Sequence, residues 1–546
     1  MKIGILIRDF DALRNWELRI IEGIRQRPSL ELCLLIKDGR MDIHTSQSKV
    51  RRALKSKNFL GKVLFTLQKK IEARIFKEKQ TEDRARVRSF LENIKTIELS
   101  PVRKGFLDIF SASDADEVRK YDLDIILRHQ FNIIRGDILG ACRYGIWSFH
   151  HGDNAINRGG PAGFWEVVLK NPVVGVTLQQ LTAELDGGLI IDKAYYNTSF
   201  SAVKNNNKIL EHSVSLLFKN IRKLERNEFD PVKSPVYYNP LYRNPSAAVT
   251  IGYMTGFYLK LCQLATREVL KRLLGIRYDC WTLFIGKGSI FDATLFRLKP
   301  VKLPKGEFWA DPFLYSHQGE LYVFFENYSY KKRSGKISCG KIQGKEITDV
   351  VDVLDLDYHL SYPFVFEEDN QVYMIPETHQ NKRMELYKCV EFPHNWELYA
   401  TAFEGESVAD ATYFKDGNGQ RWVFINKGFG DDHMAELHIF RIDSLKFDKI
   451  EAHCQNPVII DSRVGRNAGA IFRYKDKLIR PSQNNSKDIY GYGLNLNAIR
   501  TLTIENYEEE LLIAIEPNFI KGLRATHHLH QLDGVFIIDG AFKKVY

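Results

Sequence analysis

The chain has 546 residues, of which 44% are hydrophobic and 27% are charged, and its formal net charge is +10. This length exceeds one ordinary domain, and the composition excludes a disordered or fibrous protein. The seven cysteines form no CxxC pair, which disfavours a disulfide framework or a zinc site and indicates a reducing compartment. We therefore expect a cytoplasmic, globular protein with no metal ligands among its site residues.

The N-terminal segment predicts the start of a parallel sheet. Residues 2–7 and 30–36 have the apolar pattern of buried strands, and residues 15–25 between them have the spacing of a helix. This β-α-β opening is typical of a doubly wound α/β domain. It has no GxGxxG, so a dinucleotide site is not indicated, and no apolar run of 18 residues predicts a membrane span.

Residues 49–88 are dense in Lys and Arg. Such a segment suits nucleic acid, a membrane surface or an anionic small molecule, but it also fits a solvated helical insertion. No nucleic-acid-binding motif accompanies it, so we expect no nucleic-acid partner. Peripheral membrane contact through 49–88 and packing on the sheet both remain open for its helically spaced apolar residues, which are Leu60, Val63, Leu64, Leu67, Ile71 and Ile75.

The next informative stretch runs from Gly145 to Asp192. Residues 144–149 predict a buried strand, and His150 follows at its end, where open α/β sheets place their ligands. Asp186 follows the next predicted strand, 175–181. An imidazole held by a carboxylate at such an edge can transfer protons.

Four motifs in this stretch resemble those of the folate-dependent formyltransferases, in particular the sugar N-formyltransferases. Their order and spacing carry the resemblance, and Ser148 stands where that family has an Asn that steadies the formyl oxygen. The motifs are Ser148-Phe-His150, Arg158-Gly-Gly-Pro161, Gly175-Val-Thr177 and Leu185-Asp-Gly-Gly188.

The resemblance implies N10-formyltetrahydrofolate as co-substrate, with catalysis by His150, Asp186 and Ser148. It places Arg158 and Gly159 at the acceptor substrate, although Arg158 is as well explained as a charge that solvates a loop. The residues that it implies for cofactor binding are Ile138, Leu139, Glu184 and Leu185, of which the first two fit core packing equally well.

The second half of the chain is a repeat. Five segments pair similar strands, and they cover 310–326, 361–377, 409–426, 467–483 and 525–539. Their second residues are Asp311, Tyr362, Asp410, Ala468 and Thr526, which lie 51, 48, 58 and 58 residues apart. A period near 50 with paired strands predicts a five-bladed propeller. We expect 281–285 to supply the outer strand that closes the ring.

This half resembles the propellers of arabinanase-type glycoside hydrolases, and more closely the related domain of glucosamine inositolphosphorylceramide transferases. Asp311 and Asp410, and also Glu326 and Glu377, are expected near the central funnel. Carboxyl groups there can hydrogen-bond backbone at blade turns, bind a sugar, or act as the acid and base of glycoside hydrolysis.

The expected organisation is a doubly wound, formyltransferase-like α/β domain (1–228), a linker and helical connector (229–280) and an all-β five-bladed propeller (281–546). The expected function is formyl transfer from N10-formyltetrahydrofolate to the amino group of an amino sugar, nucleotide-linked, in surface-polysaccharide synthesis. The alternative is an altered formyltransferase-like domain beside a propeller that binds, transfers or hydrolyses glycans. The expected partners are thus an amino-sugar or nucleotide-sugar substrate and a glycan at the propeller, and the oligomeric state is left open.

Overall fold

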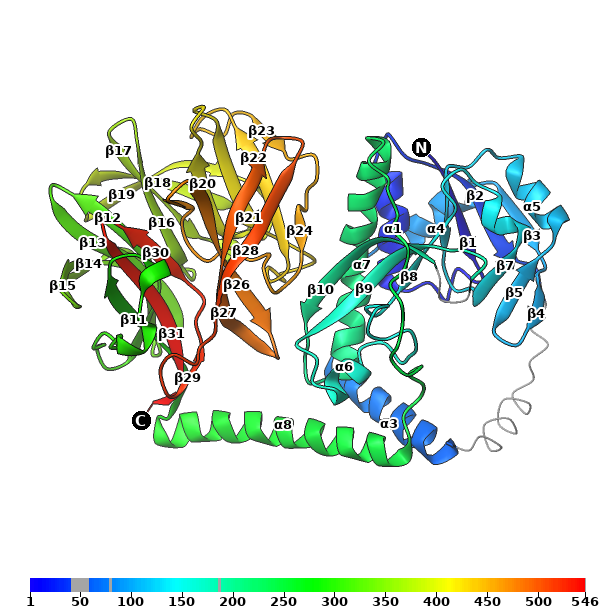
Figure 1. Ribbon diagram of the computed structural model, residues 1–546, viewed down its shortest axis with the longest axis horizontal. Coiled ribbons are helices and arrows are strands. Elements are labelled where there is room, and N and C mark those ends of the chain that lie inside the picture. The colour runs from blue at the N-terminus through cyan, green and yellow to red at the C-terminus, as the bar shows by residue number, and fades with distance from the viewer. Residues whose placement is uncertain (41–57, 78–80, 185–187, 546) are drawn as a thin grey trace. The chain divides into compact units, whose positions relative to one another are not determined.

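The computed structural model describes residues 1–40, 58–77, 81–184 and 188–545. The chain divides into two compact units, Met1–Ala194 with Thr198–Lys260, and Tyr195–Asn197 with Leu261–Tyr546 (Figure 1). None of the helices in the described ranges combines the length and the apolar character that crossing a bilayer requires.

The first unit is built on a seven-stranded sheet with the order β10-β9-β8-β6-β1-β2-β3. β1, β2, β3, β6 and β8 run parallel, and β9 is antiparallel to β8. The central strand β1 is buried on both faces, as expected for a parallel strand, and its Ile3, Ile5 and Leu6 are fully buried. The bounds are β1 (Lys2–Ile7), β2 (Glu31–Asp38), β3 (Thr96–Leu99), β6 (Ile125–Arg128), β8 (Ile146–His150), β9 (Val173–Gln180) and β10 (Leu189–Asn197). A smaller sheet joins β4 (Val102–Lys104), β5 (Leu107–Phe110) and β7 (Ile133–Gly136).

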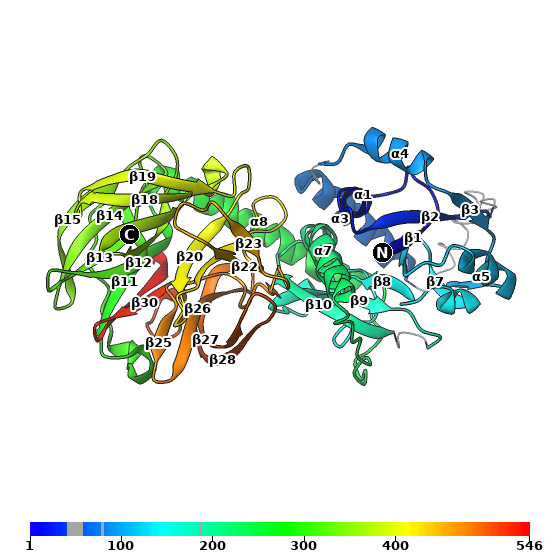
Figure 2. The same cartoon turned by 90° about the horizontal axis from the view of Figure 1, so that it is seen from above.

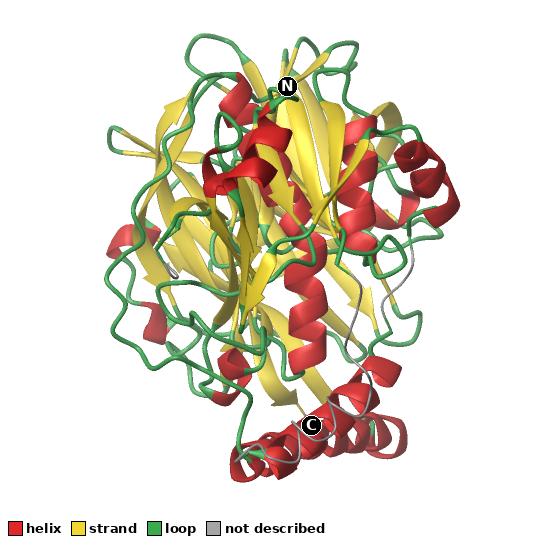
Figure 3. Cartoon of the chain, turned by 90° about the vertical axis from the view of Figure 1, so that its right-hand side faces the viewer, coloured by secondary structure: helices red, strands yellow, loops and turns green. Residues whose placement is uncertain are grey.

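Helices, red in Figure 3, pack against the sheet of this unit. One core cluster joins Ala115 and Val118 of α5 to Leu6 of β1 and Ile126 of β6. Helices α1 and α7 contact each other, and α7 also contacts β9. The bounds are α1 (Asn15–Arg25), α3 (Phe59–Ile75), α4 (Arg84–Glu92), α5 (Ala112–Arg119), α6 (Trp165–Val168), α7 (Ala202–Glu225) and α8 (Ala247–Leu274).

One buried carboxylate fixes α3 to α7 and α8. Glu72 of α3 accepts hydrogen bonds from the Tyr253 hydroxyl (2.6 Å), the Ser201 hydroxyl (2.5 Å) and the Val203 backbone N–H (3.2 Å). The Tyr253 hydroxyl in turn accepts from the Ala202 backbone N–H (2.8 Å). A buried charge is tolerated here because several donors satisfy it.

Tyr253→Phe should therefore lower the free energy of unfolding of the first unit by about 1–3 kcal/mol. The change removes one donor from Glu72 and leaves the Ala202 N–H without its acceptor. Tyr238→Phe is the matched control, because Tyr238 is 86% exposed. Urea unfolding of both variants checks the prediction, and equal midpoints would contradict it.

The second unit is a ring of five antiparallel sheets, which Figure 1 and, from above, Figure 2 show in chain order from green to red. The first blade contains β12 (Glu307–His317), β13 (Glu320–Ser329), β14 (Ser334–Gln343) and β15 (Glu346–Leu354). The second contains β16 (Ser361–Glu368), β17 (Gln371–Glu377), β18 (Met384–Glu391) and β19 (Asn395–Ala402). The third contains β20 (Ala409–Lys415), β21 (Arg421–Asn426), β22 (Glu436–Ile442), β23 (Ile450–Ala452) and β24 (Ile459–Ile460). The fourth contains β25 (Phe472–Tyr474), β26 (Lys477–Ser486), β27 (Ile489–Leu502) and β28 (Tyr507–Ile515).

The fifth blade closes the ring with strands from both ends of the unit. β11 (Arg277–Lys287) pairs antiparallel with β31 (Val535–Val545), so that Trp281 faces Ala541 and Ile285 faces Ile537. β29 (Leu523–Ala525) and β30 (Leu529–Leu532) pair with the same β31. The predicted fold class, a doubly wound α/β domain followed by an all-β five-bladed propeller, is confirmed.

Candidate functional site

Three blades begin with the same backbone feature. Asp311 of β12, Tyr362 of β16 and Asp410 of β20 have φ angles of 51°, 45° and 48°, and the pairing of each strand with the next shifts register at this point. Non-glycine residues in the left-handed region cost on the order of 1–3 kcal/mol and cluster at functional sites. These bulges make this end of the three strands a candidate functional site.

A buried guanidinium joins the carboxyl groups of two blades there. Arg466 Nε lies 2.6 Å from Asp410 Oδ2, and its Nη2 lies 3.2 Å from Asp410 Oδ1 and 3.3 Å from Glu377 Oε2. His379 Nδ1 lies 2.7 Å from the other Glu377 oxygen, and Gln483 Nε2 donates to Asp410 (3.3 Å). Two acids therefore share one guanidinium.

The pKa values of the two acids are shifted in opposite directions. Burial by itself would raise the pKa of Glu377, but the hydrogen bond from His379 and the charge of Arg466 outweigh it and hold that pKa well below its usual range. Burial and the negative charge of Glu377 raise the pKa of Asp410 well above its usual range, although Arg466 opposes this shift. The two acids titrate as a pair, with Glu377 ionising first.

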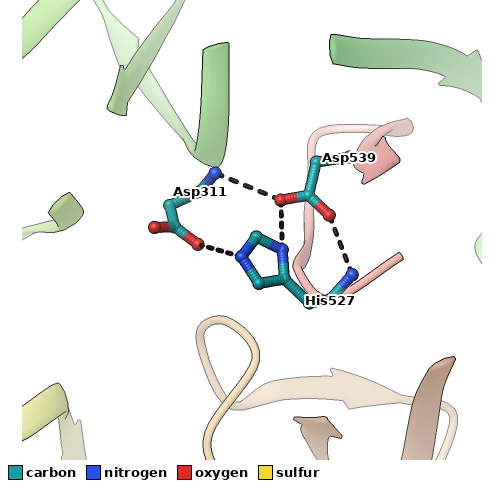
Figure 4. Close-up of side chains that lie close together, drawn as sticks. All are labelled: Asp311, His527 and Asp539. Carbon is teal, nitrogen blue, oxygen red and sulfur yellow. Dashed lines mark hydrogen bonds and ion pairs between the residues drawn. The ribbon is translucent and has the colours of Figure 1, made fainter. Parts of the chain in front are cut away.

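A second cluster lies at the ring closure (Figure 4). His527 Nδ1 lies 2.6 Å from Asp539 Oδ2, and its Nε2 lies 3.6 Å from Asp311 Oδ1. Asp539 also accepts from the backbone N–H groups of His527 and His528 (2.9 Å each) and of Asp311 (3.2 Å). Asp539 thus ties the fifth blade to the first and orients the His527 ring toward Asp311.

These three side chains approach closely enough to hold a metal ion. Three backbone N–H groups already donate to the Asp539 carboxylate. His527 Nδ1 contacts the same carboxylate without hydrogen-bond geometry, so the contacts of the imidazole with the two acids are ion pairs.

Asp311 is poised to change its charge near neutral pH. Burial raises the pKa of Asp311 to about 6, while His527 opposes the shift and Asp539 adds to it. Burial lowers the pKa of His527, but the neighbouring Asp539 and Asp311 carboxylates outweigh burial and raise it. A carboxyl group with such a pKa can give or take a proton at physiological pH.

Glu326 and aromatic rings complete the surroundings. Burial, together with the charges of Asp311 and Glu377, raises the pKa of Glu326 well above its usual range. Trp281 stacks on the His527 ring at a centroid distance of 3.8 Å, and the Arg466 guanidinium lies 5.1 Å from the centre of the Tyr490 ring. Convergent polar groups among aromatic rings are typical of small-molecule sites.

The structure thus brings the predicted Asp410 and Glu377 together through Arg466, and it places Asp311 beside His527. The sequence interpretation did not select Arg466 and Asp539. Asp539 ends the fifth repeat segment, at the place where Glu326 and Glu377 end the first two, so the repeat alignment held a signal for it. Arg466 lies just before the fourth segment, where no such alignment points to it.

In the first unit, two of the predicted catalytic residues hydrogen-bond to nearby backbone carbonyl oxygens. His150 Nε2 donates to the Asn157 carbonyl oxygen (2.6 Å). Ser148 is buried, and its hydroxyl donates to the Phe149 carbonyl oxygen (3.4 Å). Asp186 and Leu185 lie outside the described residues. The assignment of these residues to catalysis and to folate binding stays a prediction.

Most of the other predicted residues of this unit take part in core packing or in loop contacts. Ile138 is fully buried in the core, Leu139 packs against the same cluster, and Glu184 is exposed. Arg158 donates to the Asn154 (3.0 Å) and Pro235 (2.8 Å) carbonyl oxygens, which fixes its loop. A Cβ on Gly159 would lie 1.8 Å from the Tyr242 carbonyl oxygen, so only glycine fits there.

Comparison with known proteins links the propeller to one family model, "Glucosamine inositolphosphorylceramide transferase 1, N-terminal", which matches residues 300–542. The glucosamine inositolphosphorylceramide transferase 1 of Oryza sativa subsp. indica is 34% identical over 247 residues, which cover 44% of this chain and 32% of the relative. The Arabidopsis thaliana protein of the same name is 33% identical over 249 residues, with 43% and 32% covered. The chain matches about a third of the length of these relatives.

Solved structures resemble the two units separately. A 4-N formyltransferase from Francisella tularensis is 14% identical, with a TM-score of 0.28, and the match covers 46% of this chain and 85% of that one. A thermostable family-43 glycoside hydrolase is 13% identical, with a TM-score of 0.34, covering 43% and 88%. At these scores neither likeness bears on function.

The predicted function, formyl transfer to an amino sugar in polysaccharide synthesis, is wrong. The curated relatives are named as glucosamine inositolphosphorylceramide transferases, and the family model that matches has the same name. The error arose because the interpretation gave most weight to four short motifs in the first unit, whereas the similarity lies in the propeller. The predicted co-substrate N10-formyltetrahydrofolate and the cytoplasmic location stay predictions.

Proposed function

We propose that the protein is an enzyme of the transferase class that acts on a sugar-bearing substrate, and that the propeller funnel is its carbohydrate site. The observation that carries the proposal is the group of Asp311, Glu377 and Asp410 around Arg466 and His527. The names of the relatives support a sugar-bearing lipid as the substrate class.

The charges of the funnel favour a particular kind of sugar. Five buried carboxyl groups lie in or beside the two clusters, and the Arg466 guanidinium is already bound to two of them, Asp410 and Glu377. Because this guanidinium is not free to pair with a sugar carboxylate, the funnel favours neutral or amino sugars over uronic acids. The carboxyl groups are Asp311, Glu326, Glu377, Asp410 and Asp539.

The pairs of acids also suit chemistry at a glycosidic bond. Such chemistry needs one carboxyl group that is protonated and one that is ionised. The raised pKa of Asp410 makes it a candidate acid, and Asp311 is a candidate base above pH 6. His527 holds Asp311 in place and favours its ionised form.

Calorimetric titration of the full chain with disaccharides tests the proposal. We expect binding of glucosamine-containing or neutral disaccharides, and binding at least about tenfold weaker for glucuronic-acid-containing ones. Asp410→Asn should reduce the affinity, whereas Glu510→Gln, at an exposed surface pair, should not. Equal affinities for the wild type and Asp410→Asn, or no binding at millimolar sugar, would overturn the carbohydrate site.

The affinity for a neutral disaccharide should fall as the pH is lowered through about 6. Above its pKa of about 6, Asp311 is a carboxylate that accepts hydrogen bonds from sugar hydroxyl groups, and below that pH it loses this charge. The same titration at pH 5, 6, 7 and 8 measures the transition. Asp311→Asn should remove this step, and a step that persists in the variant would assign it to another group.

A further inference from the structure

Two helices of the first unit expose an apolar surface that the carbohydrate site does not explain. On α3, Leu60, Leu67 and Ile75 are 60%, 53% and 48% exposed, and on α8, Ile251 and Leu259 are 54% and 64% exposed. Single exposed apolar residues are common in soluble proteins, but several on two helices that pack against each other indicate an interaction surface.

The two helices form one rigid support. The Tyr253 hydroxyl of α8 donates to Glu72 of α3 (2.6 Å), and the Tyr258 hydroxyl donates to Gln68 of α3 (3.2 Å). Phe65 of α3 and Tyr253 share a buried cluster with Phe164. Figure 1 shows α3 beside the first part of α8, in agreement with these hydrogen bonds.

The exposed residues of α3 lie on one side of the helix. Leu60, Leu67, Ile71 and Ile75 follow one another at intervals of seven, four and four residues, which is the spacing of a helical stripe. The buried residues of α3, which include Phe65 and Glu72, lie on a different side. The stripe is therefore not used for packing within the first unit.

The charges beside the stripe all have one sign. α3 carries Lys62, Lys69, Lys70 and Arg74, and its one acidic residue, Glu72, is fully buried and bound to Tyr253 and Ser201. A helix with an exposed apolar stripe and basic neighbours lies in the interface of an anionic membrane, where the stripe enters the acyl boundary and the cations contact the headgroups.

We propose that α3 and the first half of α8 (residues 247–260) form a docking face for the surface of an anionic lipid bilayer. Leu60, Leu67, Ile71, Ile75, Ile251 and Leu259 enter the interface, and Lys70 and Arg74 contact lipid phosphates. The face binds a bilayer from one side and does not cross it. It does not depend on the carbohydrate site, which belongs to the second unit.

Flotation of the full chain with vesicles tests the docking face. We expect binding to phosphatidylcholine vesicles that contain 30% phosphatidylserine, and binding at least about tenfold weaker without the anionic lipid. Lys70→Glu/Arg74→Glu should reduce the affinity at least about twentyfold, because each cation near the surface contributes about fivefold. The matched control is Lys302→Glu/Lys305→Glu, which makes the same charge change at exposed propeller residues.

The apolar contribution needs its own pair of variants. Leu67→Gln/Ile71→Gln should reduce binding at least about tenfold, whereas Leu511→Gln, at a propeller residue 55% exposed, should not. Thermal unfolding checks that all variants are folded. The proposal is overturned if the wild type does not float with anionic vesicles, or if each double variant binds like its control. It is also overturned if light scattering shows self-association that Leu67→Gln/Ile71→Gln abolishes while vesicle binding is absent.

Discussion

Replacing Arg466 with methionine should lower the free energy of unfolding of the propeller by about 3–5 kcal/mol. Arg466 is buried and contacts Asp410 at 2.6 Å and Glu377 at 3.3 Å. Methionine fills a similar space but leaves the two acids without their shared cation. Removing one partner of a buried ionic group costs much more than the group contributes as a whole, because the remaining charge stays buried.

Denaturant unfolding measures this loss, and Arg500→Met is the matched control. Arg500 pairs with Glu510 at the surface, where both side chains are about half exposed, so its loss should cost at most about 1 kcal/mol. A loss for Arg466→Met as small as that of the control would show that Arg466 does not hold the two acids.

The pH dependence of the Arg466→Met variant gives a second readout. Without the cation, the pKa values of Asp410 and Glu377 should rise relative to the wild type, because the charge of Arg466 then no longer opposes burial at either acid. The folded variant then binds more protons than the folded wild type, so the variant should recover stability relative to the wild type as the pH falls. We expect its deficit relative to the wild type to be smaller at pH 4.5 than at pH 7.5.

Asp311→Asn should reduce sugar turnover by about 10²–10⁴-fold while the protein stays folded. The asparagine side chain has nearly the same shape, and its amide oxygen can still accept the hydrogen bond from the Tyr362 backbone N–H, which reaches Asp311 at 3.3 Å. It cannot exchange a proton near pH 6. Asp311 therefore differs from Arg466, whose removal should act through stability.

Turnover is measured with the sugar-bearing substrate that binding identifies, and kcat and KM are separated. We expect a rise in KM, because the carboxylate acceptor for the sugar is lost, and a larger loss in kcat. Asp476→Asn, at an exposed loop residue of the fourth blade, is the control for an Asp-to-Asn change and should stay within threefold of the wild type. If Asp311→Asn also stays within threefold, Asp311 does not transfer the proton, and the proposed acid–base chemistry at the funnel is contradicted.

The site could be predicted only in part. Asp311 and Asp410 were found because the repeat places them at the same position of two blades. The sequence did not reveal the charged groups around them, because Arg466 lies 56 residues from Asp410 in sequence although it lies 2.6 Å from it in space. In the first unit, the motif around His150 was visible, but the Asn157 carbonyl oxygen that holds its ring depends on the path of the loop.

Both architectures follow from patterns in the sequence. Strand and helix periodicities in residues 1–225 specify a parallel α/β sheet, and the period near 50 after residue 300 specifies five blades, since both follow from which side chains must be buried. Which charged groups share a site depends on how the folded chain brings distant residues together. The closure of the ring by β11 and β31 brings His527 and Asp539 to Asp311, and the protonation of Asp311, Glu377 and Asp410 depends on burial and on neighbours from other blades.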